Sequence, residues 1–267
     1  MRSSARVAAL ALTAAVGCTA IAAVHVAARP AVRVTAALDR TARLGGGSAL
    51  RVGMSVDTRQ RRAALRSVQI RYDAHLGVTT SGLGIDACRR PAAAYDAIVL
   101  PGDPIGRSGC PVNSLMATGT VRGEIRLDPE ATPIPENATI AIYAGAIVDD
   151  RLQIDAQVDG LNPIGARLVY AGELIPARPP WGGTLQLALP PLPPRWGAEI
   201  TLADVDLSIG ASTIVYRDPV TGRRYRPEGV QIPSRCPRGG FRVQTTLTFA
   251  DGLSDRISVA IRCPRVR

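Results

Sequence analysis

This sequence of 267 residues contains five cysteines. With Cys18 in the apolar N-terminal run set aside, the other four carry the clearest chemistry: Cys88, Cys110, Cys236 and Cys263. An even number of cysteines in an exported chain indicates two disulfide bonds. Three pairings are possible, and we expect the local one, in which Cys88 joins Cys110 and Cys236 joins Cys263. Each bond closes a loop of roughly 20–30 residues, which is worth on the order of 3 kcal/mol of chain entropy.

A zinc site is the rival interpretation of the cysteines. Tetrahedral sites built from four cysteines usually contain closely spaced cysteine pairs, and the sequence has no Cys-x-x-Cys. Outside the first 28 residues His75 is the only histidine. The sequence also lacks a phosphate-cradling glycine loop and a dinucleotide-binding fingerprint. We therefore expect no metal and no cofactor.

Nucleophilic catalysis has few candidate residues. A Ser-His-Asp triad would have to use His75, which follows Tyr72 and Asp73 at a predicted strand end, and no Gly-x-Ser-x-Gly is present. Paired cysteines are not thiolates, so a cysteine nucleophile is disfavoured. We expect His75 to be a surface or packed residue, and we name no catalytic residue.

Carboxylates are the remaining candidates for catalysis, because a glycosidase needs two of them facing each other across a cleft. The acidic middle of the chain supplies Asp149, Asp150, Asp155, Asp159, Asp204 and Asp206. Asp204 and Asp206 are two residues apart and would share one face of a strand, with Val205 and Leu207 on the other. A solvated outer face explains these acids better than a catalytic pair does.

Every one of the 32 basic residues is an arginine, and the formal net charge is +10. Residues 29–72 hold ten arginines against two acids, whereas residues 73–209 hold nine against sixteen and residues 210–267 eleven against four. Basic flanks of this kind attract anionic polymers or lipid headgroups, and Arg223, Arg224 and Arg226 are the candidate contacts. Nucleic acid is disfavoured, because the basic stretches lack a series of aromatic residues for base stacking.

The first 28 residues form an export segment. Arg2 and Arg6 precede an almost uninterrupted apolar run from Val7 to Ala28, which is typical of a secretory signal peptide cleaved after Ala28. Two alternatives stay open: the run is long enough to remain as a membrane anchor, and Val16-Gly17-Cys18 resembles a lipobox with lipidation at Cys18. Each interpretation places the rest of the chain outside the cytoplasm, secreted or anchored at the cell surface.

The elements that would position these residues are strands. Residues 29–48 predict a flexible linker that ends in Gly45-Gly46-Gly47-Ser48. Residues 49–267 predict one β domain, with a sub-boundary conceivable in the proline-rich stretch 176–196. Alternating apolar and polar residues indicate strands within 49–55, 65–72, 118–127, 139–148, 151–158, 167–175, 184–189, 199–209, 212–217, 241–249 and 257–263.

Hydrophobic residues make up 46% of the chain, which suffices for a core, while aromatic residues make up only 4%. With about ten to twelve strands and no long amphipathic helix, the pattern predicts an all-β, disulfide-stapled antiparallel sandwich, immunoglobulin-like or related. A closed barrel is the alternative, because counting strands does not distinguish the two.

Two stretches of the sequence resemble a known protein module. Ser81 to Cys88 is followed by Cys110-Pro111-Val112-Asn113-Ser114 and by Gly119-Thr120, and Cys236-Pro237 and Cys263-Pro264 flank the C-terminal hairpin. This arrangement resembles a module of exported and surface proteins of high-GC actinobacteria. The shared residues belong to disulfides and turns, so the resemblance implies a scaffold and transfers no site residue.

These observations favour a non-catalytic, exported cell-envelope or secreted protein with a binding or structural role. The alternative is a secreted polysaccharide hydrolase that uses a carboxylate pair in the acidic middle. A metal-dependent or carrier role is the third hypothesis.

Overall fold

A computed structural model describes residues 31–78, 82–89, 109–127, 132–163, 165, 167–192, 197–210 and 214–264. The chain divides into two compact units, Met1–Pro30 and Ala31–Arg267, and the first lies outside the described residues. The predicted export segment 1–28 and the lipidation candidate Cys18 therefore lie outside them too. Among the described residues, no helix has the length and apolarity needed to cross a membrane.

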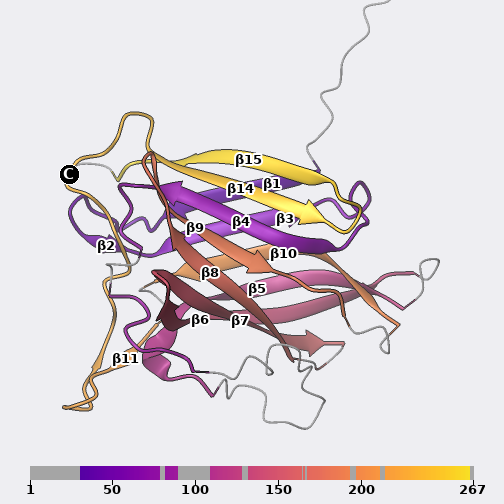
Figure 1. The fold of residues 1–267 in the computed structure, drawn as a ribbon, viewed down its shortest axis with the longest axis horizontal. Helices are drawn as coiled ribbons and strands as arrows, with labels where there is room; N and C mark the ends of the chain where they lie inside the picture. Colours follow the sequence, from indigo (N-terminus) through magenta and orange to yellow (C-terminus); the bar gives the residue numbers. More distant parts are fainter. Residues whose placement is uncertain are drawn as a thin grey trace, which may run out of the picture. The chain divides into compact units, whose positions relative to one another are not determined.

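Unit 2 is dominated by one antiparallel sheet of eleven strands (Figure 1). In spatial order the strands are β1 (Val32–Leu38), β3 (Leu50–Val56), β10 (Glu199–Ile209), β5 (Leu115–Arg126), β6 (Ile134–Val148), β7 (Arg151–Asn162), β8 (Arg167–Pro176), β9 (Trp181–Ala188), β4 (Leu65–Asp73), β14 (Phe241–Phe249) and β15 (Ser254–Ile261). Two short sheets pair β11 (Tyr216–Arg217) with β12 (Arg224–Tyr225) and β13 (Val230–Gln231) with β2 (Gly47–Ser48). The all-β, antiparallel prediction is confirmed.

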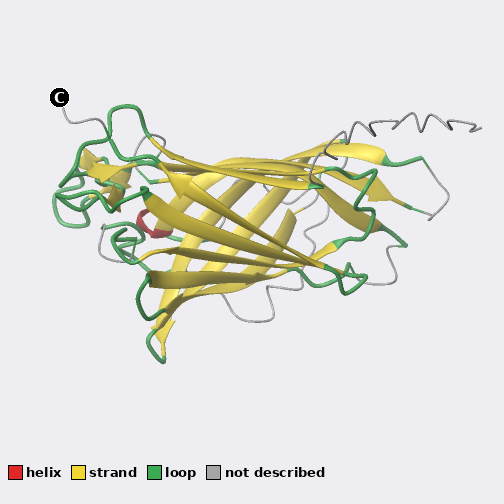
Figure 2. Cartoon of the chain, turned by 90° about the horizontal axis from the view of Figure 1, so that it is seen from above, coloured by secondary structure: helices red, strands yellow, loops and turns green. Residues whose placement is uncertain are grey.

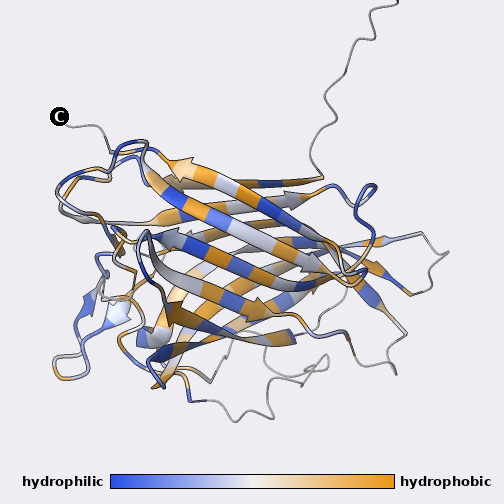
Figure 3. Ribbon diagram, turned by 45° about the horizontal axis from the view of Figure 1, so that its top comes forward, coloured by the Kyte–Doolittle hydropathy of each residue, from blue (hydrophilic) through white to orange (hydrophobic). Residues whose placement is uncertain are grey.

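The sheet curves until it is nearly closed into a barrel. Its two edge strands, β1 and β15, lie side by side (Figure 1). They share no backbone ladder, and apolar side chains pack at the seam instead, among them Val32 and Val34 of β1 and Ile257 and Val259 of β15. The strands thus form one curved sheet, and the expected sandwich of two facing sheets is not seen. Alternation along each strand is the same in both architectures, which is why the sequence left both open (Figure 3).

Two predicted boundaries need correction. Residues 29–48 were expected to form a linker, but Val32–Leu38 forms strand β1, whose residues are alternately buried and exposed at its start. Its register with β3 runs unbroken from Val32 opposite Val56 to Leu38 opposite Leu50. The sub-boundary within 176–196 is also wrong for the described residues, because β9 lies there and pairs with both β8 and β4 in the main sheet.

One end of the sheet, called the closed end below, is sealed by loops. Leu76, Leu83, Val230 and Ile232 pack there against the ends of the strands as part of one buried cluster. Tyr216 is fully buried beside them, accepts a hydrogen bond from the Gly84 N–H at 2.7 Å and donates one to the Leu115 carbonyl at 2.8 Å. The short 3-10 helix η2 (Val112–Ser114) also lies at this end (Figure 2).

Both expected disulfides are present at the closed end. Cys88 is bonded to Cys110 and Cys236 to Cys263, with Cα–Cα distances of 4.7 and 6.0 Å. The Cys88 N–H donates to the Ala144 carbonyl at 2.7 Å, and Cys236 packs against the buried cluster. The two bonds therefore fix the loops that seal this end.

Candidate functional site

The inner face of the sheet encloses a cavity of about 480 Å³. Residues from ten of the eleven strands line it, β15 being the exception. The lining is overwhelmingly aliphatic, with Val52, Ile70, Ile140, Leu185 and Leu207 as representatives. A concave, apolar space of this size falls within the range of small-molecule binding sites.

The period of two along each strand explains the apolar lining. On β6, Ala138, Ile140 and Ile142 line the cavity, and the intervening residues point outward. On β10, Val205 and Leu207 line it in the same way. The residues that line the cavity are thus the inward-facing members of the alternating pattern that predicted the strands.

The cavity remains unfilled because the side chains available to fill it are small. The chain has only two phenylalanines, Phe241 and Phe249, and both lie at the ends of β14 away from the lining. Parts of the cavity wall are formed by residues with a small side chain or none: Gly123, Ala138 and Gly160. Protein interiors are normally close-packed. An unfilled space of this kind therefore suggests that a ligand occupies it.

The cavity reaches the surface at the end opposite the closed end. Glu136 and Glu199 line it near the starts of β6 and β10, and Leu127 lines it just after β5. Glu199 is exposed, and Leu127 is 57% exposed. We call this the open end, and a ligand would enter there.

Two hydroxyl groups interrupt the aliphatic lining. Burial raises the pKa of Tyr170 to about 12, so its phenol stays protonated at physiological pH. Thr245 is 2% exposed, and its Oγ1 has no hydrogen-bond partner within the described part of the chain. Both groups are available to a polar atom of a ligand.

The six acids proposed for a hydrolase do not line this cavity. Asp149 and Asp150 form the β6–β7 turn, and both have positive φ angles, 49° and 60°. Asp204 lies 2.8 Å from Arg122, and Asp206 is exposed on the same outer face of β10. Asp159 pairs with Arg167 at 2.6 Å.

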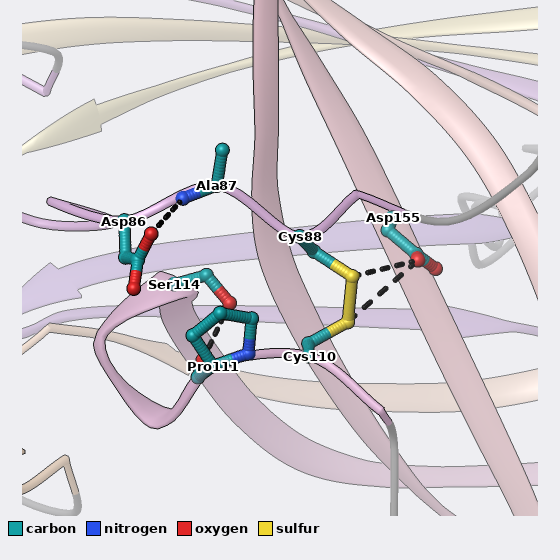
Figure 4. The surroundings of a disulfide bond; sticks show 7 residues. All are labelled: Asp86, Ala87, Cys88, Cys110, Pro111, Ser114 and Asp155. Carbon is teal, nitrogen blue, oxygen red and sulfur yellow. Dashed lines mark hydrogen bonds between the residues drawn. A yellow bond between two sulfur atoms is a disulfide. The ribbon is translucent and has the colours of Figure 1, made fainter.

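Asp155 corrects the expectation of a solvated acidic face. It is 2% exposed, and its Oδ2 lies 3.6 Å from the Cys88 sulfur and 4.0 Å from that of Cys110 (Figure 4). The Cys88–Cys110 bond therefore lies over the outer face of β7. These three residues are also the one group within the described ranges with metal-ligand spacing, but the sulfurs are bonded to each other and are not thiolate ligands.

His75 has a structural role in the described part of the chain. Its side chain is 59% exposed, and its Nδ1 lies 2.6 Å from Oδ1 of the buried Asp73. Burial raises the pKa of Asp73, but hydrogen bonds from the His75 backbone, the His75 ring and the Arg242 N–H outweigh burial and hold it below its usual value. The Asp73 carboxylate thus ties the end of β4 to the start of β14.

Arg223, Arg224 and Arg226 lie on and beside β12, and all three are exposed. Neither they nor Arg217 on β11 has an ion pair within the described ranges. Val220, at the turn between the two strands, is 91% exposed. We call residues 216–226 the arginine hairpin. Its Tyr216 is buried at the closed end and meets Tyr225 edge-to-face, with the ring centroids 5.9 Å apart.

Comparisons with protein-family models, with curated proteins and with solved structures return no match for this chain. The structure therefore defines the class of the protein at the level of a nearly closed, all-β sheet with an apolar interior. The expectations drawn from the actinobacterial resemblance remain expectations.

Neither the cavity nor the arginine that lines it was predicted from the sequence. Arg66 lies within 65–72, where Val68 and Ile70 mark the inner face, and it shares their parity. The sequence therefore contained a signal, because a charged residue occupies one of the alternate positions that are otherwise apolar. This signal was easily overlooked, since Gln69 and Arg71 in the same segment are polar residues at the outward-facing positions.

Proposed function

We propose that this protein is a non-catalytic, extracytoplasmic binding protein that holds the apolar chain of a lipid-like ligand inside its curved sheet. The observation that carries the proposal is the cavity of about 480 Å³ with its aliphatic lining. In this proposal the cavity is the site of the binding role expected from the sequence. For the carrier hypothesis, the proposed cargo is a molecule with an apolar chain. The two disulfides are compatible with an extracytoplasmic location.

Energetics supports an occupant for the cavity. Side chains around an unfilled space lose packing contacts, which lowers the stability of a protein core. The aliphatic wall of this cavity would regain such contacts when an apolar chain occupies it. An apolar ligand would recover much of this packing, whereas water gains few hydrogen bonds from an aliphatic wall.

The hydrolase alternative lacks a supporting observation. A glycosidase needs a polar, solvated cleft that presents two carboxylates. The six acids proposed for it lie elsewhere than in the cavity lining, and Asp155, Asp159 and Asp204 already contact a disulfide or an arginine.

The affinity for straight-chain alcohols is expected to rise with chain length. Each methylene buried contributes about 0.8 kcal/mol, so each step from octanol to decanol to dodecanol should tighten Kd by about 15-fold until the cavity is full. Isothermal titration calorimetry of the full chain measures Kd and stoichiometry, and one ligand per chain is expected. Equal affinity along the series, or no saturable binding, would rule out the proposed function.

We also propose that the arginine hairpin contacts anionic lipid headgroups. Three exposed arginines without ion pairs in the described ranges follow a turn that presents Val220. The one acid in that turn, Asp218, accepts hydrogen bonds from the Val220 and Thr221 N–H groups, and these hold its pKa below the usual value. An apolar tip beside cations suits a membrane surface better than a soluble polymer.

Vesicle sedimentation tests this contact. The full chain is expected to bind phosphatidylglycerol vesicles and not phosphatidylcholine vesicles, and binding should weaken as salt rises. The triple variant Arg223→Gln, Arg224→Gln, Arg226→Gln should bind about 100-fold more weakly, since each cation near the surface contributes about 1 kcal/mol. Unchanged binding by the triple variant would contradict the proposal, and binding to soluble polyphosphate alone would reassign the hairpin to anionic envelope polymers.

A further inference from the structure

Arg66 forms a β-bulge at the open end of the cavity. On β4, Ser67 lies opposite Thr248 and Leu65 lies opposite Phe249, so Arg66 is the extra residue between two consecutive partners on β14. Bulges of this kind bend the strand and re-aim a side chain. The Arg66 carbonyl still accepts a hydrogen bond from the Leu189 N–H at 2.8 Å, which fixes the bulged backbone against the segment after β9.

The side chains around the bulge face the interior. Leu65, Arg66, Val68 and Ile70 all line the cavity. Among the described residues, Arg66 is thus the one basic residue in a lining whose other polar side chains are Glu136, Glu199, Tyr170 and Thr245. It lies at the start of β4, at the open end, where a ligand headgroup would remain after its chain had entered.

Arg66 has no carboxylate partner within the described part of the chain. It is half-buried, and no ion pair or side-chain hydrogen bond of its guanidinium is found there. Arg61, by contrast, forms two hydrogen bonds with Asp255. A guanidinium beside an apolar space is unfavourable unless a counter-charge accompanies it.

Among the described residues, the acids that line the cavity do not supply that counter-charge. The Glu136 carboxylate accepts hydrogen bonds from the Leu161 and Asn162 N–H groups on its own side of the sheet. Glu199 is exposed at the start of β10, and within the described part of the chain it forms no ion pair with Arg66.

We propose that the ligand is a single-chain amphiphile with a carboxylate headgroup, whose chain fills the cavity and whose head is bound by the Arg66 guanidinium. The planar guanidinium donates two parallel hydrogen bonds to a carboxylate, a geometry that an ammonium or a hydroxyl does not match. This inference rests on the proposed function and adds the charge of the ligand to it.

Three probes with one chain length separate the inference from the proposed function. Dodecanoate, dodecanol and dodecyltrimethylammonium are titrated by calorimetry, below their micellar concentrations, into the natural chain and into the Arg66→Gln variant. We expect the natural chain to bind dodecanoate at least about 10-fold more tightly than dodecanol, because a hydrogen bond to a charged group contributes that much to binding. Arg66→Gln should abolish that preference and leave the Kd of dodecanol within about twofold.

Arg33→Gln is the matched control. Arg33 lies on the outward, exposed face of β1, near the open end, so its replacement removes the same charge without reaching the cavity. It should keep the preference for dodecanoate. Thermal unfolding of both variants checks that they fold.

The outcomes are distinguishable. Failure of all three probes to bind would overturn the proposed function and this inference together. Equal binding of dodecanoate and dodecanol, a preference for the cation, or a preference for dodecanoate that survives Arg66→Gln would overturn the inference alone.

Discussion

The Ala138→Trp variant is expected to bind dodecanol about 200-fold more weakly than the natural chain. Ala138 lines the cavity from β6 and is 6% exposed, so an indole at this position would extend into the space that the ligand chain needs. Displacing about four methylenes at about 0.8 kcal/mol each removes about 3 kcal/mol of binding free energy, or roughly 200-fold in Kd. Calorimetry of the variant measures the loss.

Ala188→Trp is the matched control for this occlusion. Ala188 is exposed on β9, between Leu187 and Leu189, which both line the cavity, and its own side chain points outward. The control should bind dodecanol as the natural chain does. If Ala138→Trp folds, by circular dichroism and thermal unfolding, and binds equally well, the ligand does not occupy the cavity. Should that variant fail to fold, Val121→Phe supplies a milder occlusion from β5.

Replacing Cys88 and Cys110 together by alanine is expected to lower the free energy of unfolding by about 3.4 kcal/mol. The two cysteines are 22 residues apart, and cross-linking a loop of that size removes this much conformational entropy from the unfolded chain. The 27-residue separation of Cys236 and Cys263 gives about 3.6 kcal/mol by the same reasoning. Together the two losses approach the whole stability of a typical domain.

Urea unfolding of the two double-alanine variants and of the quadruple variant measures these losses. Because both disulfides fix loops at the closed end, unfolding there should precede loss of the sheet, and hydrogen exchange should rise first at Leu83 and Val230. Losses below about 1 kcal/mol in both double variants would contradict the view that the disulfides hold the closed end together.

Local structure was predictable because the residues that specify it are neighbours in sequence. The apolar alternation in Phe241–Phe249 predicted β14, and its hairpin with β15 brings Cys236 and Cys263 together as expected. The Asp149-Asp150 turn was also predictable, since both residues adopt the positive φ that a two-residue hairpin turn requires. The local disulfide pairing followed from the same short-range geometry.

Long-range features were not predictable in the same way. Whether one sheet closes on itself or two sheets stack depends on strand curvature and on the β1–β15 seam, which no local pattern records. The strand Val32–Leu38 was missed because its alternation is interrupted by Thr35-Ala36-Ala37, residues with weak hydrophobic contrast. Asp155 was expected on a solvated face because the disulfide that covers it comes from a segment more than forty residues away.

The cavity illustrates the difference most clearly. The sequence showed that the interior is aliphatic, with few aromatic residues. Whether such side chains fill the interior depends on the diameter of the curved sheet, which is set by the number and the tilt of its strands. Arg66 shares the inward parity of Val68 and Ile70, but the bulge that it forms against β14 is a property of two strands paired across more than 170 residues.

The central claim is that a ligand chain lies inside the sheet, and its location is the most direct test. Intermolecular nuclear Overhauser effects between dodecanol and the methyl-labelled full chain would report that location. The proposal predicts contacts from the terminal methyl of the ligand to Ile142, Leu185 and Leu207, which line the cavity. Contacts confined to Ile147, Val148 and Val220, which are exposed on the outside, would contradict it.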